Sequence, residues 1–449
     1  MSGSPALVRS PTPFAELLLR DVHLFDPRGG LDARHDLLVR AGAIAQIGAP
    51  GTLTAEGDVE VLEGGGSLRA LPAFFDPHVH LRSPGQEHKE DIESGTRAAA
   101  AGGFGAVIAM PNTVPPIDSA ELLRAVREVA SQRARVPVGF LPALTRGLDG
   151  ERLTEMAALR EAGALGFTDD GHPVASAGVL REALRLQRAC GGVIALHEED
   201  RSLSRGGSMH EGALSAELGI PGIPCASEAT MVARDAVLAG CEGGRVHFQH
   251  LSCVASVEAL AAAKAHGVAV SAEVTPHHLL LTEEGLRGLD TNLKMNPPLA
   301  TEADRLALVE GLRSGTIDCV ATDHAPHARA EKELPFTEAP MGTTGLETAF
   351  AALYTGLVLP GVLELGTLVE RMTAGAALFE LPTPRIATGE PANVTLIDLE
   401  AEWTAGEHGW ESRSESCCFA GRRLRGRVLL TLAAGAVAHR ATARAAVAA

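Results

Sequence analysis

Two histidines separated by one residue, His78 and His80, stand in the apolar stretch from Phe75 to Arg82. Side chains two positions apart on a strand point to the same side, so both imidazoles can bind one metal ion while Val79 faces away. A His-x-His pair alone is weak support for a metal, because solvated or packed histidines are more common. The chemistry therefore depends on which other residues the fold brings to this point.

The composition fits a large enzyme that acts on small molecules. At 449 residues, the chain is long enough for one α/β barrel with an accessory domain. Its formal net charge of -17 argues against a nucleic-acid groove or an acidic membrane surface, because both require clustered Lys and Arg. The seven cysteines are scattered without CxxC spacing, and no apolar run resembles a signal peptide or membrane span. We expect a cytoplasmic protein with no nucleic-acid or membrane partner.

Three kinds of segment follow along the chain. Residues 1–14 are predicted to be a flexible tail. Short apolar segments alternate with Gly, Asp and Pro turns in residues 15–70 and again in 381–449, and we expect both ends to form one composite β-sandwich. Between them, residues 71–380 alternate strand-like apolar runs with helical segments, a pattern typical of βα units around a parallel sheet.

Eight candidate strands occur in the central segment, which predicts an α/β fold with a TIM-like (β/α)8 barrel. The predicted strands end near Asp76, Met110, Leu141, Phe167, Leu196, Gln249, Ala272 and Thr322. Barrels of this kind place their chemistry at the C-terminal ends of the strands. The residues that follow these positions therefore form the candidate site.

Histidines and carboxylates gather after five of the predicted strands. They are His78, His80, Asp169, Asp170, His197, His250 and Asp323. Histidines placed only for packing would have no reason to collect at strand ends, so this distribution indicates a metal site. Imidazole and carboxylate ligands without thiolate favour Zn²⁺, and their number favours two ions with a bridging hydroxide. The expected reaction is a hydrolysis or its reverse, in which Asp323 also takes the proton from the attacking water.

The same residues stand in motifs that resemble those of bacterial type I dihydroorotases, members of the amidohydrolase superfamily. The motifs are Asp76-Pro77-His78-Val79-His80-Leu81-Arg82, Met110-Pro111-Asn112-Thr113, Phe167-Thr168-Asp169-Asp170-Gly171, Lys294-Met295-Asn296-Pro297-Pro298-Leu299, Asp323-His324-Ala325-Pro326-His327 and Gly345-Leu346-Glu347-Thr348. The similarity covers nearly the whole chain, including the split β-sandwich. It implies a zinc enzyme, with two ions per subunit.

The resemblance also implies a role for each ligand. His78 and His80 would bind the first metal, and His197 and His250 the second. Asp170 would bridge the two ions, and Asp323 would be both a ligand and the general acid and base. Asp169 remains an alternative bridge, although the spacing of Asp170 from His197 matches the family better. If Asp170 is the bridge, Asp169 would orient a ligand or cap the loop.

The positions of the lysines distinguish this chain from other members of the superfamily. Dihydropyrimidinases and hydantoinases bridge their metals with a carboxylated lysine at the end of strand four, where this chain has Asp170. The four lysines are Lys89, Lys264, Lys294 and Lys332, and none of them is near that position. A hydantoinase-like ring opener is therefore the less favoured alternative.

The implied substrates are N-carbamoyl-L-aspartate and (S)-dihydroorotate, which interconvert by ring closure in pyrimidine biosynthesis. Both carry a carboxylate that takes no part in the reaction, and Arg82 offers a planar bidentate partner for it. The resemblance implies a set of substrate contacts that comprises His80, Arg82, Asn112, Asn296, His327, Met341 and Gly342. Of these, Asn112 and His327 would join Arg82 at the carboxylate, and Asn296 with the backbone of Met341 and Gly342 would contact the ureido atoms of the ring.

A non-enzymatic alternative is a scaffold for aspartate transcarbamoylase, because some homologues have lost their ligands. The full ligand set favours catalysis here, although association with that enzyme could coexist with activity. We also expect a homo-oligomer. The charged, Pro-containing segment 328–342 is a candidate lid, and residues 198–200 resemble a solvated charge run.

Overall fold

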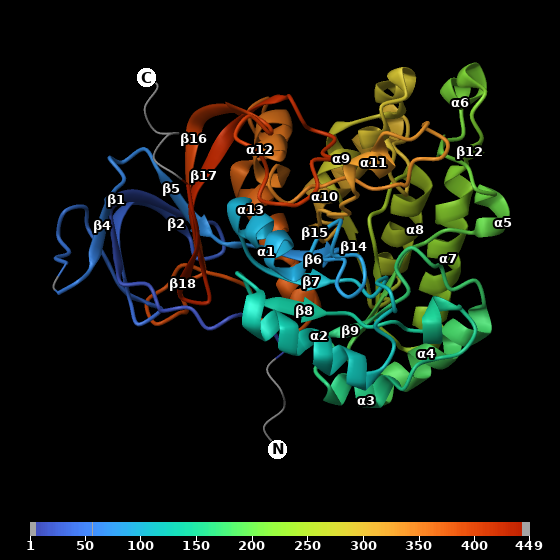
Figure 1. The fold of residues 1–449 in the computed structure, drawn as a ribbon, viewed down its shortest axis with the longest axis horizontal. Coiled ribbons are helices and arrows are strands. Elements are labelled where there is room, and N and C mark those ends of the chain that lie inside the picture. The colour runs from blue at the N-terminus through green and yellow to red at the C-terminus, as the bar shows by residue number, and fades with distance from the viewer. Residues whose placement is uncertain (1–5, 56, 442–449) are drawn as a thin grey trace.

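The two ends of the chain meet in one sheet. The computed structural model describes residues 6–55 and 57–441. The sheet contains β1 (Leu17–Asp26), β2 (Leu31–Arg40), β3 (Ala43–Gly48), β4 (Glu60–Glu63), β5 (Arg69–Pro72), β16 (Val394–Thr404), β17 (Arg423–Ala433) and β18 (Ala436–Arg440). Its order is β18-β17-β16-β5-β1-β2-β3, with β4 paired to β1, and Figure 1 shows the blue and red strands side by side.

This composite sheet is continuous across the junction of the two ends. β5 pairs with β1 in parallel and with β16 in antiparallel orientation, so hydrogen bonds connect all eight strands. Buried aliphatic side chains such as Leu19, Leu37, Leu396 and Leu430 share one apolar cluster. The predicted union of both chain ends is therefore present, as one hydrogen-bonded sheet with its own core.

Eight parallel strands form the central part of the molecule. They are β6 (Phe74–Val79), β7 (Phe104–Ala109), β8 (Val138–Phe140), β9 (Gly166–Thr168), β10 (Val193–Leu196), β13 (Val246–Phe248), β14 (Val270–Val274) and β15 (Cys319–Val320). Each ends within three residues of its predicted end. They pair as a three-stranded sheet, β6-β7-β8, and a five-stranded sheet, β9-β10-β13-β14-β15.

Backbone hydrogen bonds link these two sheets at both edges. Leu165 N donates to Phe140 O at 3.0 Å, which joins β9 to β8. His80 N donates to His324 O at 2.9 Å, which joins the end of β6 to the residues after β15. At this second junction, the buried Asp76 carboxylate accepts from Thr322 Oγ1 at 2.6 Å. The C-terminal ends of the first and last strands are thereby held together.

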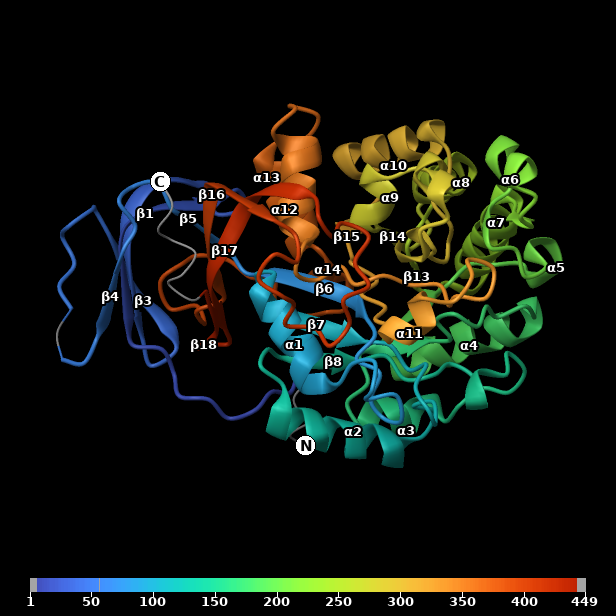
Figure 2. The ribbon, with the colours of Figure 1, turned by 45° about the horizontal axis from the view of Figure 1, so that its top comes forward.

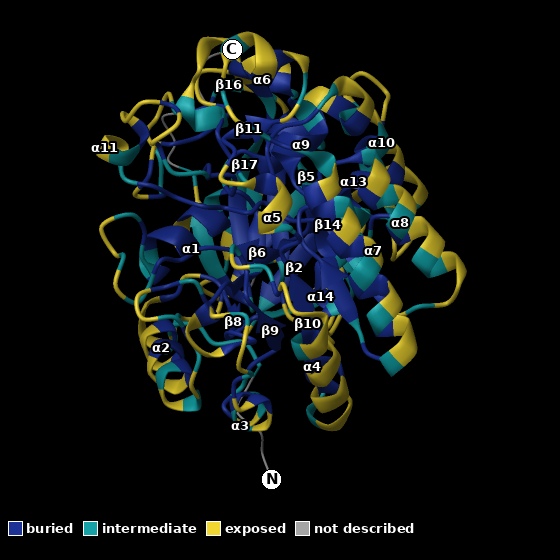
Figure 3. Cartoon of the chain, turned by 90° about the vertical axis from the view of Figure 1, so that its right-hand side faces the viewer, coloured by how far each residue is buried: buried dark blue, intermediate teal, exposed yellow. Residues whose placement is uncertain are grey.

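Helices cover the outside of the strands (Figure 2). The main ones are α1 (Ile92–Ala101), α2 (Ala120–Arg133), α3 (Met156–Glu161), α4 (Ala177–Cys190), α7 (Cys225–Glu242), α8 (Val254–Ala265), α10 (Glu302–Ser314), α12 (Ala349–Leu353), α13 (Leu365–Thr373) and α14 (Gly375–Leu378). In α4, Leu180, Ala183 and Leu184 are buried at helical spacing and Ser176 caps the N-terminus. Figure 3 shows this division, with buried inner and exposed outer faces on α2 and α4.

Short helices and strands lie in the loops that follow the parallel strands. They are α5 (Arg201–Ser204), β11 (Met209–His210), α6 (Ala213–Leu218), β12 (Gly222–Ile223), α9 (Pro276–Leu280) and α11 (Arg329–Lys332). Of the predicted N-terminal tail, residues 1–5 lie outside the described residues, and Val8 pairs with Val138. Within the described residues, every helix is too short or too polar to cross a bilayer.

Candidate metal centre

The structure brings the six predicted metal ligands together at the C-terminal ends of the parallel strands. His78 lies in β6 and His80 follows it, Asp170 follows β9, His197 follows β10, His250 follows β13 and Asp323 follows β15. All six residues are at most 7% exposed. Charged and polar groups buried to this extent require partners of opposite charge or a metal ion.

Asp170 lies at the centre of this cluster. Its Oδ1 atom is 3.5 Å from His78 Nε2, 3.7 Å from His197 Nδ1 and 3.6 Å from His250 Nε2. Its Oδ2 atom is 3.3 Å from His80 Nε2. One carboxylate therefore faces all four histidines, which is the arrangement that a carboxylate needs to bridge two cations.

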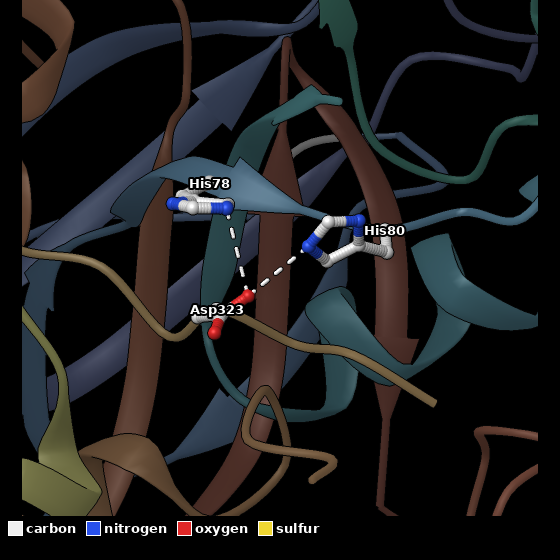
Figure 4. A group of neighbouring side chains, drawn as sticks. All are labelled: His78, His80 and Asp323. Atoms are coloured by element: carbon white, nitrogen blue, oxygen red, sulfur yellow. Dashed lines mark hydrogen bonds and ion pairs between the residues drawn. The ribbon is translucent and has the colours of Figure 1, made fainter. Parts of the chain in front are cut away.

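Asp323 approaches the cluster from the last strand. Its Oδ1 atom is 3.1 Å from His80 Nε2 and 3.5 Å from His78 Nε2 (Figure 4). On the other side, His197 Nδ1 and His250 Nε2 lie 3.0 Å apart. Two imidazole nitrogens at this distance either share one proton or direct both lone pairs at a cation. His78 Nε2 has no hydrogen-bond partner within the described residues, as expected of a nitrogen reserved for a metal.

Hydrogen-bond acceptors fix the tautomers of the first two histidines. Glu273 Oε1 lies 2.6 Å from His78 Nδ1, and Asn112 Oδ1 lies 2.8 Å from His80 Nδ1. Both rings donate from Nδ1, so their Nε2 lone pairs point into the cluster. Asn112, predicted to contact substrate, thus also orients a ligand.

Glu199 has the corresponding position beside His197. Its Oε2 atom is 3.5 Å from His197 Nε2 and accepts from Asn296 Nδ2 at 3.1 Å. This arrangement directs His197 Nδ1 into the cluster. The prediction of a solvated charge run at 198–200 is wrong for Glu198, which is 3% exposed, and Glu199 is half-buried. The sequence alone could not distinguish carboxylates that partner a histidine from carboxylates that face water.

Glu273, in β14, connects several parts of the cluster. Besides His78, it accepts from the backbone N of His250 at 3.3 Å, and its Oε2 atom is 3.0 Å from His247 Nε2. Burial raises the pKa of this carboxyl, but the charge of His78 and the bonds to His78 and His247 lower it to about 2. The sequence analysis missed Glu273, although an acidic residue within an apolar strand is a signal for a buried partner.

The charges in the cluster depend on one another. Burial raises the pKa values of Asp170 and Asp323, but the adjacent histidines, first His78, lower both below their usual range. Burial lowers the pKa of His78, whereas Glu273 and then the two aspartates raise it well above its usual value. The carboxylates therefore attract positive charge to this position. A divalent cation can supply that charge in place of a proton.

Asp169 points away from the histidines. Its Oδ1 atom accepts from the backbone N of Leu144 at 2.8 Å and of Thr145 at 2.9 Å, and Thr145 Oγ1 donates to Oδ2. These bonds fix the loop after β8 to the loop after β9. Of the two adjacent aspartates, Asp170 is the one among the histidines.

A cavity of about 220 Å³ borders the cluster. Its walls include every residue predicted to contact substrate, namely His80, Arg82, Asn112, Asn296, His327, Met341 and Gly342. Four of the candidate ligands line it as well, namely Asp170, His197, His250 and Asp323. A bound small molecule would therefore touch the cluster and the predicted substrate residues at once.

One side of the cavity carries positive charge. Arg82 is 9% exposed, and its Nε atom donates to Pro326 O at 3.1 Å. Burial lowers the pKa of His327, and Arg82, Lys332 and Lys89 lower it further, to about 3. The His327 imidazole is thus neutral at pH 7, and the Arg82 guanidinium on this side of the cavity is the charge that attracts an anion.

Met341 and Gly342 approach the cavity with their backbone. Met341 O accepts from His327 Nε2 at 2.8 Å. Gly342 has a φ of 138°, and a Cβ there would lie 2.7 Å from Ala325 O. Only glycine fits this close approach.

Two lysines hold the segment predicted as a lid. Lys294 Nζ donates to Ala339 O at 2.7 Å, and Lys332 Nζ donates to Pro340 O at 3.0 Å. Both lysines are buried, and Lys332 belongs to α11 within the segment. These bonds position segment 328–342 beside the cavity.

Parallel βα units with a buried histidine and carboxylate cluster at the strand ends define a hydrolase of the amidohydrolase type. Among solved structures, the fold is similar to an L-hydantoinase (dihydropyrimidinase) from Arthrobacter aurescens, with a TM-score of 0.84 and 26% identity over 94% of this chain and 96% of that one. A D-hydantoinase (dihydropyrimidinase) from Thermus sp. has a TM-score of 0.79, with 27% identity over 94% of this chain and 95% of that one.

Sequence comparison identifies the family more specifically than the similarity of folds does. Residues 69–258 match the model of the dihydro-orotase-like family. The chain is 43% identical to a dihydroorotase of Syntrophotalea carbinolica over 95% of this chain and 99% of that protein. It is 45% identical to a dihydroorotase of Geobacillus thermodenitrificans over 92% of this chain and 96% of that protein. The chain belongs to the dihydroorotase family of cyclic amidohydrolases.

The position of Glu273 leads to the first prediction. Glu273→Gln preserves the shape of the side chain but removes the charge that holds the proton on His78 Nδ1. We expect the affinity of the centre for zinc to fall roughly 10- to 100-fold, measured by competition with a chelator. The matched control is Glu258→Gln, an exposed carboxylate on α8. An unchanged affinity in Glu273→Gln would contradict the role given to this carboxylate.

Proposed function

We propose that the protein catalyses the reversible cyclisation of N-carbamoyl-L-aspartate to (S)-dihydroorotate and water. The observation that carries this proposal is the shared cavity, which is lined both by the Arg82 guanidinium and by the histidine and carboxylate cluster. A carboxylate-bearing cyclic amide needs both sides at once: one to bind its spectator carboxylate and one to open its ring.

The residues fit two zinc ions per subunit. His78, His80 and Asp323 have ligand atoms within 4.8 Å of one another, as do His78, Asp170 and His250. We assign His78 and His80 to one ion and His197 and His250 to the other, with Asp170 between them. When bound, the ions would acidify a water molecule and polarise the ring carbonyl.

Asp323 is the proposed general base and acid. In ring opening, it takes the proton from the attacking water and delivers it to the ring nitrogen that leaves, so the C–O bond forms as the C–N bond breaks. Ring closure runs through the same steps in reverse. Its lowered pKa keeps the carboxylate ionised, so the side chain carries no proton of its own before the water attacks.

Substrate orientation follows from the walls of the cavity. Arg82 would bind the spectator carboxylate with two parallel hydrogen bonds, supported by Asn112 and His327. Asn296 and the backbone of residues 341–342 would contact the ureido part of the ring. His80 lies between both groups and would touch substrate as well as metal.

The lysines disfavour the hydantoinase alternative. Lys89 pairs with Glu331 and Lys264 with Asp318. Lys294 and Lys332 are engaged by carbonyl groups of the segment beside the cavity. A carboxylated lysine bridge would need one of these side chains in the cluster, and Asp170 occupies that place instead.

The proposal extends to the scaffold. Residues 71–380 would act as one closed (β/α)8 barrel, and residues 15–70 with 381–449 as a sandwich-like domain, with 1–14 as a tail. Homo-oligomerisation, association with aspartate transcarbamoylase and a cytoplasmic location remain predictions from the sequence. A scaffold without activity is disfavoured, because the full ligand set is present.

The second prediction tests the activity itself. Purified protein should open dihydroorotate in an ultraviolet assay, with kcat/KM at least about 100-fold higher than for dihydrouracil, which lacks the carboxylate.

Chelation should remove the activity and Zn²⁺ should restore it, with metal analysis giving two ions per chain. Equal turnover of both rings would favour the hydantoinase alternative, and no turnover of either would favour the scaffold.

The third prediction concerns proton transfer. Asp323→Asn keeps a metal-binding oxygen but cannot accept the proton, so kcat should fall on the order of 100- to 10,000-fold while zinc is still partly bound. Steady-state kinetics and metal analysis of the same preparation measure both effects. Asp149→Asn, in an exposed turn, is the control. Near-normal kcat in Asp323→Asn would refute the acid and base assignment.

The fourth prediction concerns the spectator carboxylate. Arg82→Ala removes a buried charge partner worth about 3 kcal/mol, so KM for dihydroorotate should rise on the order of 100-fold. Arg97→Ala, at an exposed position of α1, should leave KM within twofold. If Arg82→Ala also leaves KM unchanged, the carboxylate binds elsewhere.

A further inference from the structure

A second group of metal-binding side chains lies outside the catalytic cluster. His210 from β11, Cys225 at the first position of α7 and Asp304 in the first turn of α10 offer ligand atoms that all lie within 4.8 Å of one another. Figure 1 places β12, α6 and α7 on the side of the barrel away from the composite sheet. Three segments distant in sequence therefore converge at one point.

The side chains are oriented for a shared ion. Cys225 Sγ lies 3.9 Å from His210 Nδ1, too far for a strong hydrogen bond but close enough for both atoms to bind one cation. Asp304 Oδ1 accepts a single bond, from Val254 N at 2.9 Å, and retains a second lone pair. His210 and Asp304 are each 7% exposed, so this lone pair and the imidazole are largely removed from water.

A fourth side chain points to a ligand independently. Glu283 is 9% exposed, and its Oε2 atom has no hydrogen-bond partner within the described residues. This oxygen and His210 Nε2 lie 3.5 and 3.8 Å from the position that a Cβ on Gly212 would take. Glu283 and His210 both lie near Gly212, but no hydrogen bond or ion pair joins them within the described residues. A buried carboxylate oxygen without a partner near His210 favours a cation at this point.

We propose that His210, Cys225 and Asp304 form a separate site for a thiophilic divalent cation, of the class of Zn²⁺ and Cd²⁺. Sulfur, imidazole and carboxylate together select borderline and soft ions over Mg²⁺ or Ca²⁺. The ion would deprotonate the Cys225 thiol as it binds. It would also cross-link β11, α7 and α10.

The presence of sulfur distinguishes this site from the catalytic centre, whose candidate ligands are all nitrogen or oxygen. Cadmium bound to a thiolate absorbs in the ultraviolet by charge transfer, whereas cadmium bound only to imidazole and carboxylate does not. Titration with Cd²⁺, under reducing conditions, of the full chain loaded with only two equivalents of zinc should therefore produce this absorption with one equivalent. The readout does not depend on turnover, so its failure is distinct from failure of the proposed dihydroorotase activity.

Matched variants identify the ligands. Cys225→Ser should abolish the absorption, and His210→Gln should weaken cadmium binding at least tenfold. Cys241→Ser, which removes an exposed thiol at the end of α7, should leave both unchanged. Absorption that persists in Cys225→Ser, or that disappears in Cys241→Ser, would overturn the proposal. Unchanged affinity in His210→Gln would also overturn it, because cadmium would then bind Cys225 without the imidazole, for example together with the neighbouring Cys253.

Discussion

The burial of Asp170 among four imidazoles is the constraint on which the site depends. A carboxylate removed from water costs several kcal/mol unless positive charge compensates it, and Asp170 is 3% exposed. Protonation of His78 can supply that charge only by using the Nε2 lone pair that faces the carboxylate. A divalent cation supplies more positive charge, and the same histidine lone pairs form the coordination bonds to it. Without an ion, the buried charges of this cluster are unfavourable in free energy. The same geometry therefore favours the binding of a metal ion.

The ligands are positioned from within the strands. Glu273 in β14 orients His78 and holds the backbone N of His250. Asp76 in β6 accepts from the side chain of Thr322, the residue before Asp323. These two buried carboxylates thus connect the ends of β6, β13, β14 and β15. The loops at the strand ends would provide substrate specificity. The distances between the candidate metal ligands depend instead on the buried carboxylates within the strands.

Much of this arrangement could be predicted from the sequence. Histidines and aspartates after apolar runs marked the strand ends, because a parallel barrel places those ends on one rim. What could not be predicted were the partners that depend on side-chain direction. Glu199 looked solvated beside Glu198 and Asp200, and Glu273 was hidden inside a strand. The two chain ends had a recognisable strand pattern, but only strand pairing shows that β5 joins them into one continuous sheet.

Local charge explains how an acidic protein can bind an anion. The chain has a net charge of -17, so its long-range field repels dihydroorotate, and attraction must arise within the cavity. Arg82 lines the cavity, and burial, Arg82, Lys332 and Lys89 lower the pKa of His327 so that this ring stays neutral. A neutral imidazole can donate one hydrogen bond and accept another. We propose that selectivity for a carboxylate-bearing ring follows from one buried cation, Arg82, beside the histidine and carboxylate cluster, where water screens its charge least.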